Sequence, residues 1–202
     1  MKNTLTVSHL LSAYSQGIFP MSDEKGRISW YCPDPRAIIP LETYKPSKSL
    51  RSTLNKQLFE IRINEQFEQV MRSCSKPRTE TDGVWISDEM IAVYCELHQL
   101  GFAHSVEAFQ DNVLVGGLYG VCLGGVFFGE SMFSEVSNSS KVAFHSLIQL
   151  LKANKFELLD TQFINDNVLR YGAIEIDRDD FLLRLSQGLS KSCTFSLDGM
   201  AK

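Results

Sequence analysis

The hydrophobic residues of this chain follow two periodicities that separate helices from strands. Apolar side chains at Leu10 and Tyr14, after the N-cap candidate Ser8, predict a first helix. That helix is expected to end near Gly17. The segment "WYCPDPR" at residues 30–36 carries two prolines two positions apart, which excludes a helix and predicts a rigid extended stretch.

The rest of the pattern predicts further helices and strands in an irregular order. Helices are expected at residues 48–57, 64–74, 87–101, 141–154, 165–172 and 177–187. Strands are expected at residues 59–63, 84–86, 104–109, 113–123, 126–133, 156–163 and 173–176. The Gly124-Gly125 pair should close a hairpin between two of these strands. This order predicts an α+β or mixed α/β fold around a largely antiparallel sheet.

The composition is that of an ordinary globular protein. Hydrophobic residues make up 44% and charged residues 22% of the 202 positions, enough apolar material for a sizeable core. No stretch approaches the roughly 20 apolar residues of a membrane span, and the first twenty residues lack the core of a signal peptide. The five cysteines form no C-x-x-C pair and the four histidines show no ligand spacing. We therefore expect a cytoplasmic protein with reduced thiols and no metal site.

Charge is distributed unevenly along the chain. The net charge is −4 overall, but the segment from Lys45 to Arg78 holds eight basic and three acidic residues, a net +5. The rest of the chain is therefore −9. Such a tract is either a solvated face or a surface that follows phosphates, where each Lys or Arg contact releases counterions. The candidates for contact with nucleic acid are Lys45, Lys48, Arg51, Lys56 and Arg62.

Three polar residues stand out at the ends of apolar strands. In "GESMF", side chains two apart share a strand face, so Glu130 is expected beside Phe128 and Met132. In "LLDTQF", the same rule places Asp160 beside Gln162. Two carboxylates and a carboxamide at the edge of an apolar pocket could hold an amine, orient it and accept its proton.

A purely structural explanation of these residues also fits their spacing. Asp160 could cap the segment that follows it, and Glu130 could pair with an arginine such as Arg170 or Arg178. The spacing alone leaves both explanations open.

Eight short segments, taken in order, resemble those of one bacterial enzyme family. They are "AYSQGIFPM", "WYCPDPR", "VWIS", "GFAHSVE", "LVGGLYGVCLGGVFFGESMFS", "SSKVAF", "LLDTQF" and "YGAIEI". Their content and order are similar to the leucyl/phenylalanyl-tRNA protein transferase family, over a stretch from about Leu10 to Phe181. The resemblance implies transfer of leucine or phenylalanine, with methionine as a further candidate, from aminoacyl-tRNA to proteins that begin with arginine or lysine.

The resemblance also implies a fold and a set of functional residues. A small N-terminal domain at residues 1–45 would precede an acetyltransferase-like (GNAT-like) catalytic domain at residues 46–202. By their match to the family's motifs, Asp160, Gln162 and Glu130 would be catalytic, and Trp85, Trp30 and Tyr31 would lie near the terminal adenosine of the tRNA. The remaining substrate-binding residues would be Leu118, Phe127, Met132, Ser134, Phe144, Leu147, Leu159 and Asn165.

Two positions depart from the pattern of the family. The second aromatic residue before "PDPR" is Tyr31 here instead of tryptophan, and Leu118 stands where methionine is common. Both changes are conservative, and they bear on adenosine stacking and on donor preference. The family's products are degradation signals read by a Clp adaptor, so the expected partners are aminoacyl-tRNA, acceptor proteins and that machinery, for a monomer without a cofactor.

Two other classes of function remain open from the sequence. An acyl-CoA-dependent N-acyltransferase would share the fold, but it needs a glycine-rich pyrophosphate loop before a helix, and "SEVSNSSK" is not one. A non-catalytic tRNA-binding module would keep the basic tract, and it would have no need of Glu130, Asp160 and Gln162 together.

Overall fold

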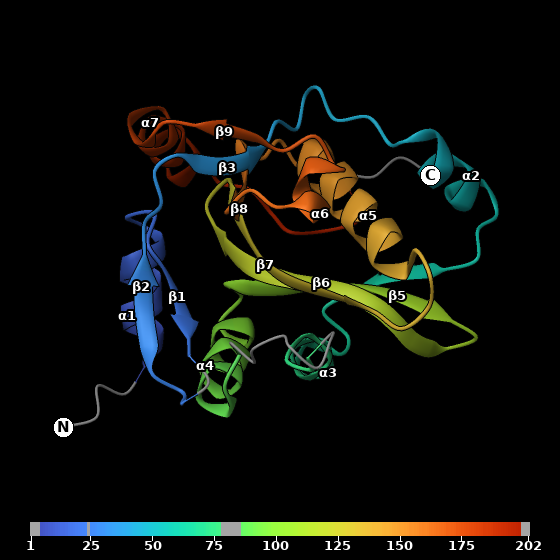
Figure 1. Ribbon diagram of the computed structural model, residues 1–202, viewed down its shortest axis with the longest axis horizontal. Coiled ribbons are helices and arrows are strands. Elements are labelled where there is room, and N and C mark those ends of the chain that lie inside the picture. The colour runs from blue at the N-terminus through green and yellow to red at the C-terminus, as the bar shows by residue number, and fades with distance from the viewer. Residues whose placement is uncertain (1–4, 24, 78–85, 199–202) are drawn as a thin grey trace.

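A seven-stranded sheet forms the centre of the computed structural model, which describes residues 5–23, 25–77 and 86–198 (Figure 1). The strand order is β4-β5-β6-β7-β8-β3-β9, and every neighbouring pair is antiparallel except β7 and β8. The strands are β3 (Arg36–Ile39), β4 (Glu60–Ile63), β5 (Ala103–Gln110), β6 (Val113–Leu123), β7 (Val126–Ser134), β8 (Leu158–Gln162) and β9 (Ile174–Ile176). The predicted α+β class with a mixed, largely antiparallel sheet is confirmed.

Helices cover both faces of this sheet. One face carries α5 (Ser139–Ala153), and the other carries α3 (Phe67–Cys74) and α4 (Asp88–Gln99), as Figure 1 shows. Gly116 on β6 allows α5 to begin close to the sheet, because a Cβ atom there would lie 2.1 Å from the Ser139 hydroxyl. Each face has its own apolar core, with Phe144 and Leu147 in the α5 core and Tyr94 and Tyr119 in the α3/α4 core.

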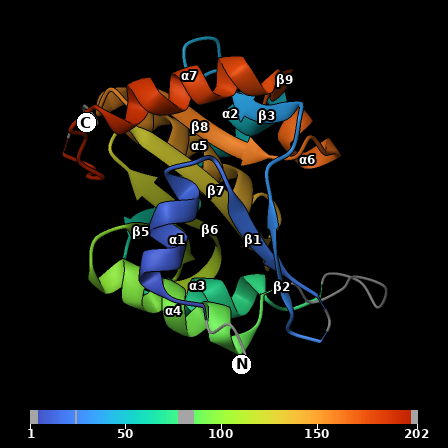
Figure 2. The same cartoon turned by 90° about the vertical axis from the view of Figure 1, so that its left-hand side faces the viewer.

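The N-terminal elements and the last long helix stand at one end of the molecule. The N-terminal group is α1 (Val7–Tyr14) with a hairpin of β1 (Phe19–Ser22) and β2 (Ile28–Tyr31). Figure 2 shows α1 in front of the sheet, with α4 below it and α7 (Arg178–Leu189) across the top. The two shorter helices are α2 (Lys48–Asn55) and α6 (Asp166–Leu169).

Local sequence signals located several element ends correctly. Ser87 and Asp177 cap α4 and α7 as expected, each accepting a backbone N–H with its side chain. Gly124 turns the β6–β7 hairpin at φ +57°. The predicted cap Ser8 is wrong, because Thr6 accepts the N–H of His9 and α1 begins earlier. The expected strand at residues 84–86 falls largely outside the described residues.

Three strands near the N-terminus were not predicted as strands, although the extended stretch predicted at residues 30–36 includes the end of β2 and the start of β3. β1 and β2 form a separate two-stranded sheet, and β3 lies between β8 and β9 in the large sheet. All four residues of β3 are buried, so the strand shows no alternation of polar and apolar positions. β3 lies within residues 1–45, so it joins the expected N-terminal segment to the large sheet. The division of the chain at residue 45 stays a prediction.

A β-bulge in β7 changes the face on which its residues lie. Tyr119 pairs with Ser131 and Gly120 with Gly129, so Glu130 is left without a partner on β6. The predicted common face of Phe128, Glu130 and Met132 is therefore wrong. Phe128 belongs to the α3/α4 core, and Met132 packs against the α5 core.

The only parallel pair of the sheet is also short. β7 pairs with β8 over Val126–Phe128 and Leu158–Asp160, and in the described part of the chain the ladder of paired residues ends there. Two residues later, Gln162 has φ +66°, a left-handed conformation that turns the chain away. The edge of β7 from Gly129 onward is thus left open where the two strands separate.

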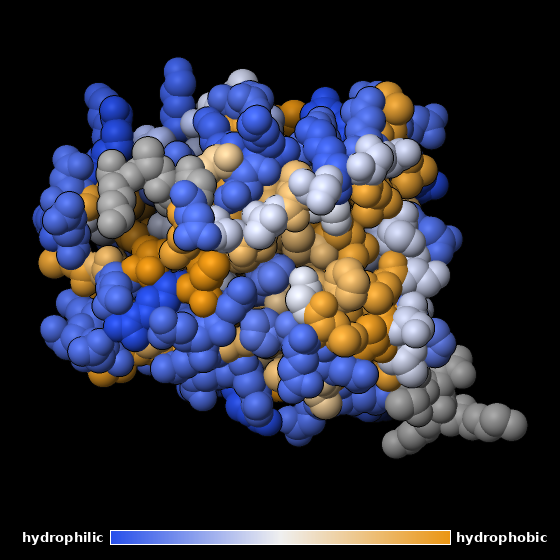
Figure 3. Space-filling view, turned by 180° about the vertical axis from the view of Figure 1, so that it is seen from behind, coloured by the Kyte–Doolittle hydropathy of each residue, from blue (hydrophilic) through white to orange (hydrophobic). Residues whose placement is uncertain are grey.

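One face of the molecule is seen in Figure 3, where hydrophilic residues surround several hydrophobic patches. Within the described ranges, no helix is both long and apolar enough to cross a membrane.

Candidate active site

A cavity of about 370 Å³ lies where β7 separates from β8. Six of the residues predicted for the site line it: Leu118, Glu130, Met132, Phe144, Leu147 and Asn165. Residues that the sequence did not single out complete the lining, among them Tyr119, Thr161 and Val168. One end of the cavity is an apolar slot between β6, β7 and α5, and the carboxylate of Glu130 belongs to its polar end.

Several predicted residues lie outside the cavity lining. Phe127 and Leu159 are fully buried in the α5 core behind the slot. Ser134 is exposed, and its hydroxyl lies 2.9 Å from that of Ser139. Asn165 caps α6 as well as lining the cavity. Trp85 lies outside the described residues, so its position stays a prediction.

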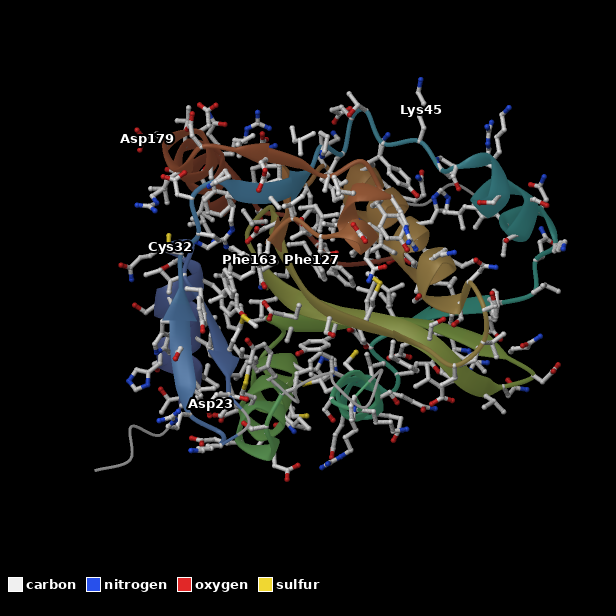
Figure 4. All side chains as sticks on the ribbon, in the orientation of Figure 1. Asp23, Cys32, Lys45, Phe127, Phe163 and Asp179 are labelled. Carbon is white, nitrogen blue, oxygen red and sulfur yellow. The ribbon has the colours of Figure 1, made fainter. Side chains whose placement is uncertain are left out.

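The aromatic residues before "PDPR" lie on the N-terminal hairpin. Trp30 and Tyr31 are exposed on β2. The Tyr31 ring packs against Phe19 and against Phe163, with ring centroids 6.0 and 6.2 Å apart. Figure 4 shows Phe163 between this hairpin and the centre of the sheet. The hairpin therefore reaches the chain immediately after Gln162.

Asp160 is held in a buried ion pair with Arg36. The Arg36 guanidinium donates to both carboxylate oxygens, at 2.8 Å from Nε to Oδ1 and 2.6 Å from Nη2 to Oδ2. The two side chains are 1% and 0% exposed. Arg36 also donates to the carbonyl of Gly17 at 3.0 Å and lies over the rings of Phe19 and Phe181. Asp160 is therefore anchored from behind and does not line the cavity.

A chain of hydrogen bonds leads from this ion pair to the cavity. Asp160 Oδ1 accepts the backbone N–H of Gln162 at 2.9 Å. The Gln162 side-chain Nε2 donates to Glu130 Oε1 at 2.9 Å. The same Glu130 oxygen accepts the Tyr14 hydroxyl at 2.6 Å, and Tyr14 lies 2.5 Å from the hydroxyl of Tyr94. The three predicted catalytic residues thus form one network.

The pairing of Glu130 with Arg170 or Arg178 that was considered from spacing is wrong. An arginine does pair with one of the two carboxylates, but the pair is Arg36 with Asp160. Arg178 instead lies 3.7 Å from Asp34 at the surface. Glu130 has a tyrosine and a carboxamide as partners, and no ion pair with a cation is found for it among the described residues.

The surroundings of Glu130 favour its protonated form. Burial raises the pKa of Glu130 from its ordinary value to about 8, and the nearby charge of Asp160 adds to this, while the hydrogen bond from Tyr14 opposes it. Burial also raises the pKa values of Tyr14 and Tyr94 well above the ordinary range. A carboxyl group with a pKa near neutrality in a cavity is typical of a functional site.

Sequence reasoning missed the partners that fix this network. Arg36 is the last residue of "WYCPDPR". The two prolines of this segment predict an extended backbone, and they carry no information about the partner of the arginine. Tyr14 was assigned to the core of the first helix, and it is fully buried there. A buried arginine needs a carboxylate, but the sequence contains 24 acidic residues and does not show which one pairs with it.

The basic tract divides into two parts in the structure. Arg62 is engaged by Glu60 and Glu65, and Arg72 by Glu68. Among the described residues, the ion pairs found include none with Lys45, Lys48, Arg51 or Lys56, which are all exposed on or beside α2. Figure 4 shows Lys45 pointing away from the molecule. Lys45 also borders a cavity of about 300 Å³ lined by Lys141 and Arg170.

An apolar slot that ends at a carboxylate and a carboxamide defines a site for a group-transfer enzyme that handles an amine. Comparison with protein families identifies the kind of transferase. The family described as leucyl/phenylalanyl-tRNA protein transferase matches residues 38–186, and its N-terminal domain matches residues 3–34. The chain belongs to the leucyl/phenylalanyl-tRNA protein transferase family.

Two curated relatives that carry this name match the chain over nearly their whole length. The chain is 47% identical over 192 residues to a leucyl/phenylalanyl-tRNA protein transferase of Prosthecochloris aestuarii, covering 95% of this chain and 99% of that protein. It is 50% identical over 196 residues to one of Herpetosiphon aurantiacus, covering 96% and 100%. Among solved structures, L-PGS from Bacillus licheniformis is similar at a TM-score of 0.48 and 10% identity, covering 91% of this chain and 70% of that one.

Replacing Arg36 by methionine should lower the free energy of unfolding by about 3–5 kcal/mol, because the buried Asp160 carboxylate loses its partner. The matched control Arg178→Met removes an exposed arginine and should change it by less than about 1 kcal/mol. Urea unfolding measures both. Adding Asp160→Asn to Arg36→Met should restore part of the loss, and equal effects of the two single variants would show that the ion pair does not hold the fold.

Glu130→Gln should stabilise the protein relative to wild type more at pH 8.5 than at pH 5. Since the pKa of Glu130 is raised to about 8 in the folded protein, the unfolded chain releases this proton first as pH rises above about 4.5. The wild-type protein therefore loses stability as the pH rises from about 4.5 to about 8, because Glu130 stays protonated in the folded state. The glutamine variant has no such proton and does not lose stability in this way. Urea midpoints at the two pH values test this, with exposed Glu135→Gln as the control. A constant difference between wild type and Glu130→Gln would contradict it.

Proposed function

We propose that this protein transfers leucine or phenylalanine from aminoacyl-tRNA to the N-terminal amine of proteins that begin with arginine or lysine. Membership of the family supports the transfer and its donor. The observation that carries the proposal within this chain is the apolar slot beside Glu130 and Gln162. The acceptor preference and the roles of single residues rest on the chemistry argued below.

The slot accounts for the choice of donor. Leu118, Met132, Phe144 and Leu147 offer an apolar lining and no charged group to the donor side chain. Leucine, phenylalanine and methionine are unbranched at Cβ and can enter such a slot, whereas isoleucine and valine would clash near its mouth. Since one methylene in a pocket is worth only about 1–3 kcal/mol, selectivity among the three accepted donors should be graded.

The reaction needs positioning more than strong acid or base catalysis. The acceptor amine attacks the ester carbonyl, a C–N bond forms, and the ester C–O bond breaks as the terminal ribose hydroxyl leaves with a proton. With an α-amino pKa of about 7.7–8.0, roughly a tenth of the acceptor is neutral at pH 7. Fixing the two reactants in a near-attack geometry can supply about 7–11 kcal/mol of the barrier reduction.

Gln162 is suited to orient the attacking amine. Because its Nε2 donates to Glu130, its Oε1 faces the other way and can accept an N–H bond from the acceptor. A neutral carboxamide is a weak base, so Gln162 orients the amine and does not remove its proton. The φ of +66° at Gln162 places this side chain where β8 separates from β7.

Asp160 and Glu130 have different roles. Asp160 is fully buried with Arg36, so it acts on the reaction through Gln162, whose backbone N–H it accepts. It is a positioning residue. Glu130 lines the cavity and has a pKa of about 8, so it can stabilise an ammonium group when ionised.

The tRNA would bind along the exposed basic residues of α2. Lys45, Lys48, Arg51 and Lys56 provide four cations on one side of the molecule, and Lys141 and Arg170 extend that region toward α6. Arg62 is bound by two carboxylates, which makes it the weakest member of the predicted set. The binding mode would be contact with phosphates, without reading of the bases.

The products would be degradation signals read by a Clp adaptor, made by a monomer in the cytoplasm. Trp85, Trp30 and Tyr31 would stack near the terminal adenosine, with Tyr31 held by Phe19 and Phe163. An acyl-CoA-dependent transferase and a tRNA-binding module without catalysis are the two competing functions. Neither needs an aminoacyl ester as donor.

Radiolabelled leucine should pass from Leu-tRNA to a peptide that begins with arginine and not to a matched peptide that begins with serine. Gln162→Ala should lower the turnover number about a hundredfold while binding of aminoacyl-adenosine is retained, because the attacking amine loses its acceptor. Scintillation counting of the isolated peptide measures the transfer. No incorporation from Leu-tRNA or Phe-tRNA would reject the proposal in favour of the two competing functions.

Charge reversal on α2 should weaken tRNA use specifically. Arg51→Glu or Lys48→Glu should raise the KM for Leu-tRNA and reduce its dependence on salt, because fewer counterions are released. Transfer from aminoacyl-adenosine, which lacks the tRNA body, should not change. The control is Arg184→Glu, an exposed arginine on α7 at the opposite end of the molecule from α2 (Figure 1). An unchanged salt slope in the α2 variants would place the tRNA elsewhere.

A further inference from the structure

Two buried polar atoms in the cavity have no hydrogen-bond partner among the described residues. They are the hydroxyl of Tyr119 and Oε2 of Glu130. Both residues line the same cavity, and the charge of Glu130 is close enough to contribute to the raised pKa of Tyr119. Buried polar groups in folded proteins are almost always paired, so both atoms lack a partner that the described part of the chain could supply.

The packing around Tyr119 does not explain its hydroxyl. Its ring is 0% exposed and meets Tyr94 and Phe67 edge to face, with centroids 5.9 and 6.0 Å away. Phenylalanine would make the same ring contacts, without leaving a buried oxygen unpaired. The unpaired hydroxyl therefore indicates a binding site for a ligand. The ring contacts hold the Tyr119 side chain, and with it the hydroxyl, in a fixed position.

We infer that Tyr119 and Glu130 together bind the α-ammonium group of the donor aminoacyl ester. This inference rests on the proposed function. An ammonium group carries a positive charge that favours the ionised form of Glu130, and its three N–H donors suit a carboxylate oxygen and a phenol oxygen at the same time. Oε2 of Glu130 is available for this role, since Tyr14 and Gln162 both donate to Oε1.

The geometry of the sheet favours the donor amine over the acceptor amine. Leu118 and Tyr119 are neighbours on β6, so they lie on opposite faces, Leu118 in the α5 core and Tyr119 in the α3/α4 core. An α-carbon at the open edge of β7, where pairing with β8 has ended, would send its side chain toward Leu118. Its amine would then point toward Tyr119. The acceptor amine is left to Gln162 Oε1.

Binding of two stable donor analogues tests the inference. One is phenylalanine joined by an amide bond to 3′-amino-3′-deoxyadenosine, and the other is the same compound with 3-phenylpropionate, which lacks only the amine. Wild type should bind the phenylalanyl compound more tightly. Tyr119→Phe should weaken the binding of the phenylalanyl compound about tenfold, which corresponds to the loss of one hydrogen bond to a charged group. The binding of the 3-phenylpropionyl compound should not change. Calorimetry measures both dissociation constants.

The control variant is Tyr44→Phe. Tyr44 is also buried, but its hydroxyl lies 3.1 Å from His145 Nδ1 and outside the cavity lining, so neither compound should bind differently. Equal weakening of both compounds by Tyr119→Phe, or no weakening of either, would overturn the inference, as would equal affinity of wild type for the two. Loss of leucine transfer by wild type would instead reject the proposed function, so the two failures are distinguishable.

Discussion

The buried ion pair between Arg36 and Asp160 is the constraint on which the rest of the molecule depends. Each ion loses several kcal/mol of hydration on burial, and the pair compensates with two short hydrogen bonds. The third donor of Arg36 reaches the carbonyl of Gly17, and aromatic rings from β1 and α7 lie at 4.8 and 4.4 Å from the guanidinium. One arginine thus joins the N-terminal hairpin, β3, β8 and the last helix.

The same ion pair determines the geometry of the reaction site. Asp160 holds the backbone of Gln162, Gln162 holds Glu130, and Glu130 is bound from the other side by Tyr14. The last two of these contacts join elements distant in sequence, β8 to β7 and β7 to α1, so the position of the cavity wall depends on the docking of α1 on the sheet. Helix α1 and strands β7 and β8 therefore share one hydrogen-bonded network.

The sequence predicted most helices and the β6–β7 hairpin because their periodicity and caps are local signals. It also singled out Glu130, Asp160 and Gln162, which the structure joins by hydrogen bonds, and six of the predicted residues line the cavity. It did not predict β3, whose four buried residues show no alternation. The bulge at Glu130 and the partner of Arg36 were missed for a common reason. Both depend on contacts between strands, which form only in the folded sheet. The spacing of residues along one strand does not show which residues of another strand will lie beside it.

The backbone at residue 162 has a consequence for how such a protein can evolve. A left-handed φ of +66° suits glycine, and any other residue there is strained by about 1 kcal/mol or more. Glycine would relieve this strain, but it would also remove the hydrogen bond that the side chain of Gln162 donates to Glu130. The strain at residue 162 is therefore tolerated together with a carboxamide that is held in place beside the cavity, and neither feature can be changed without the other.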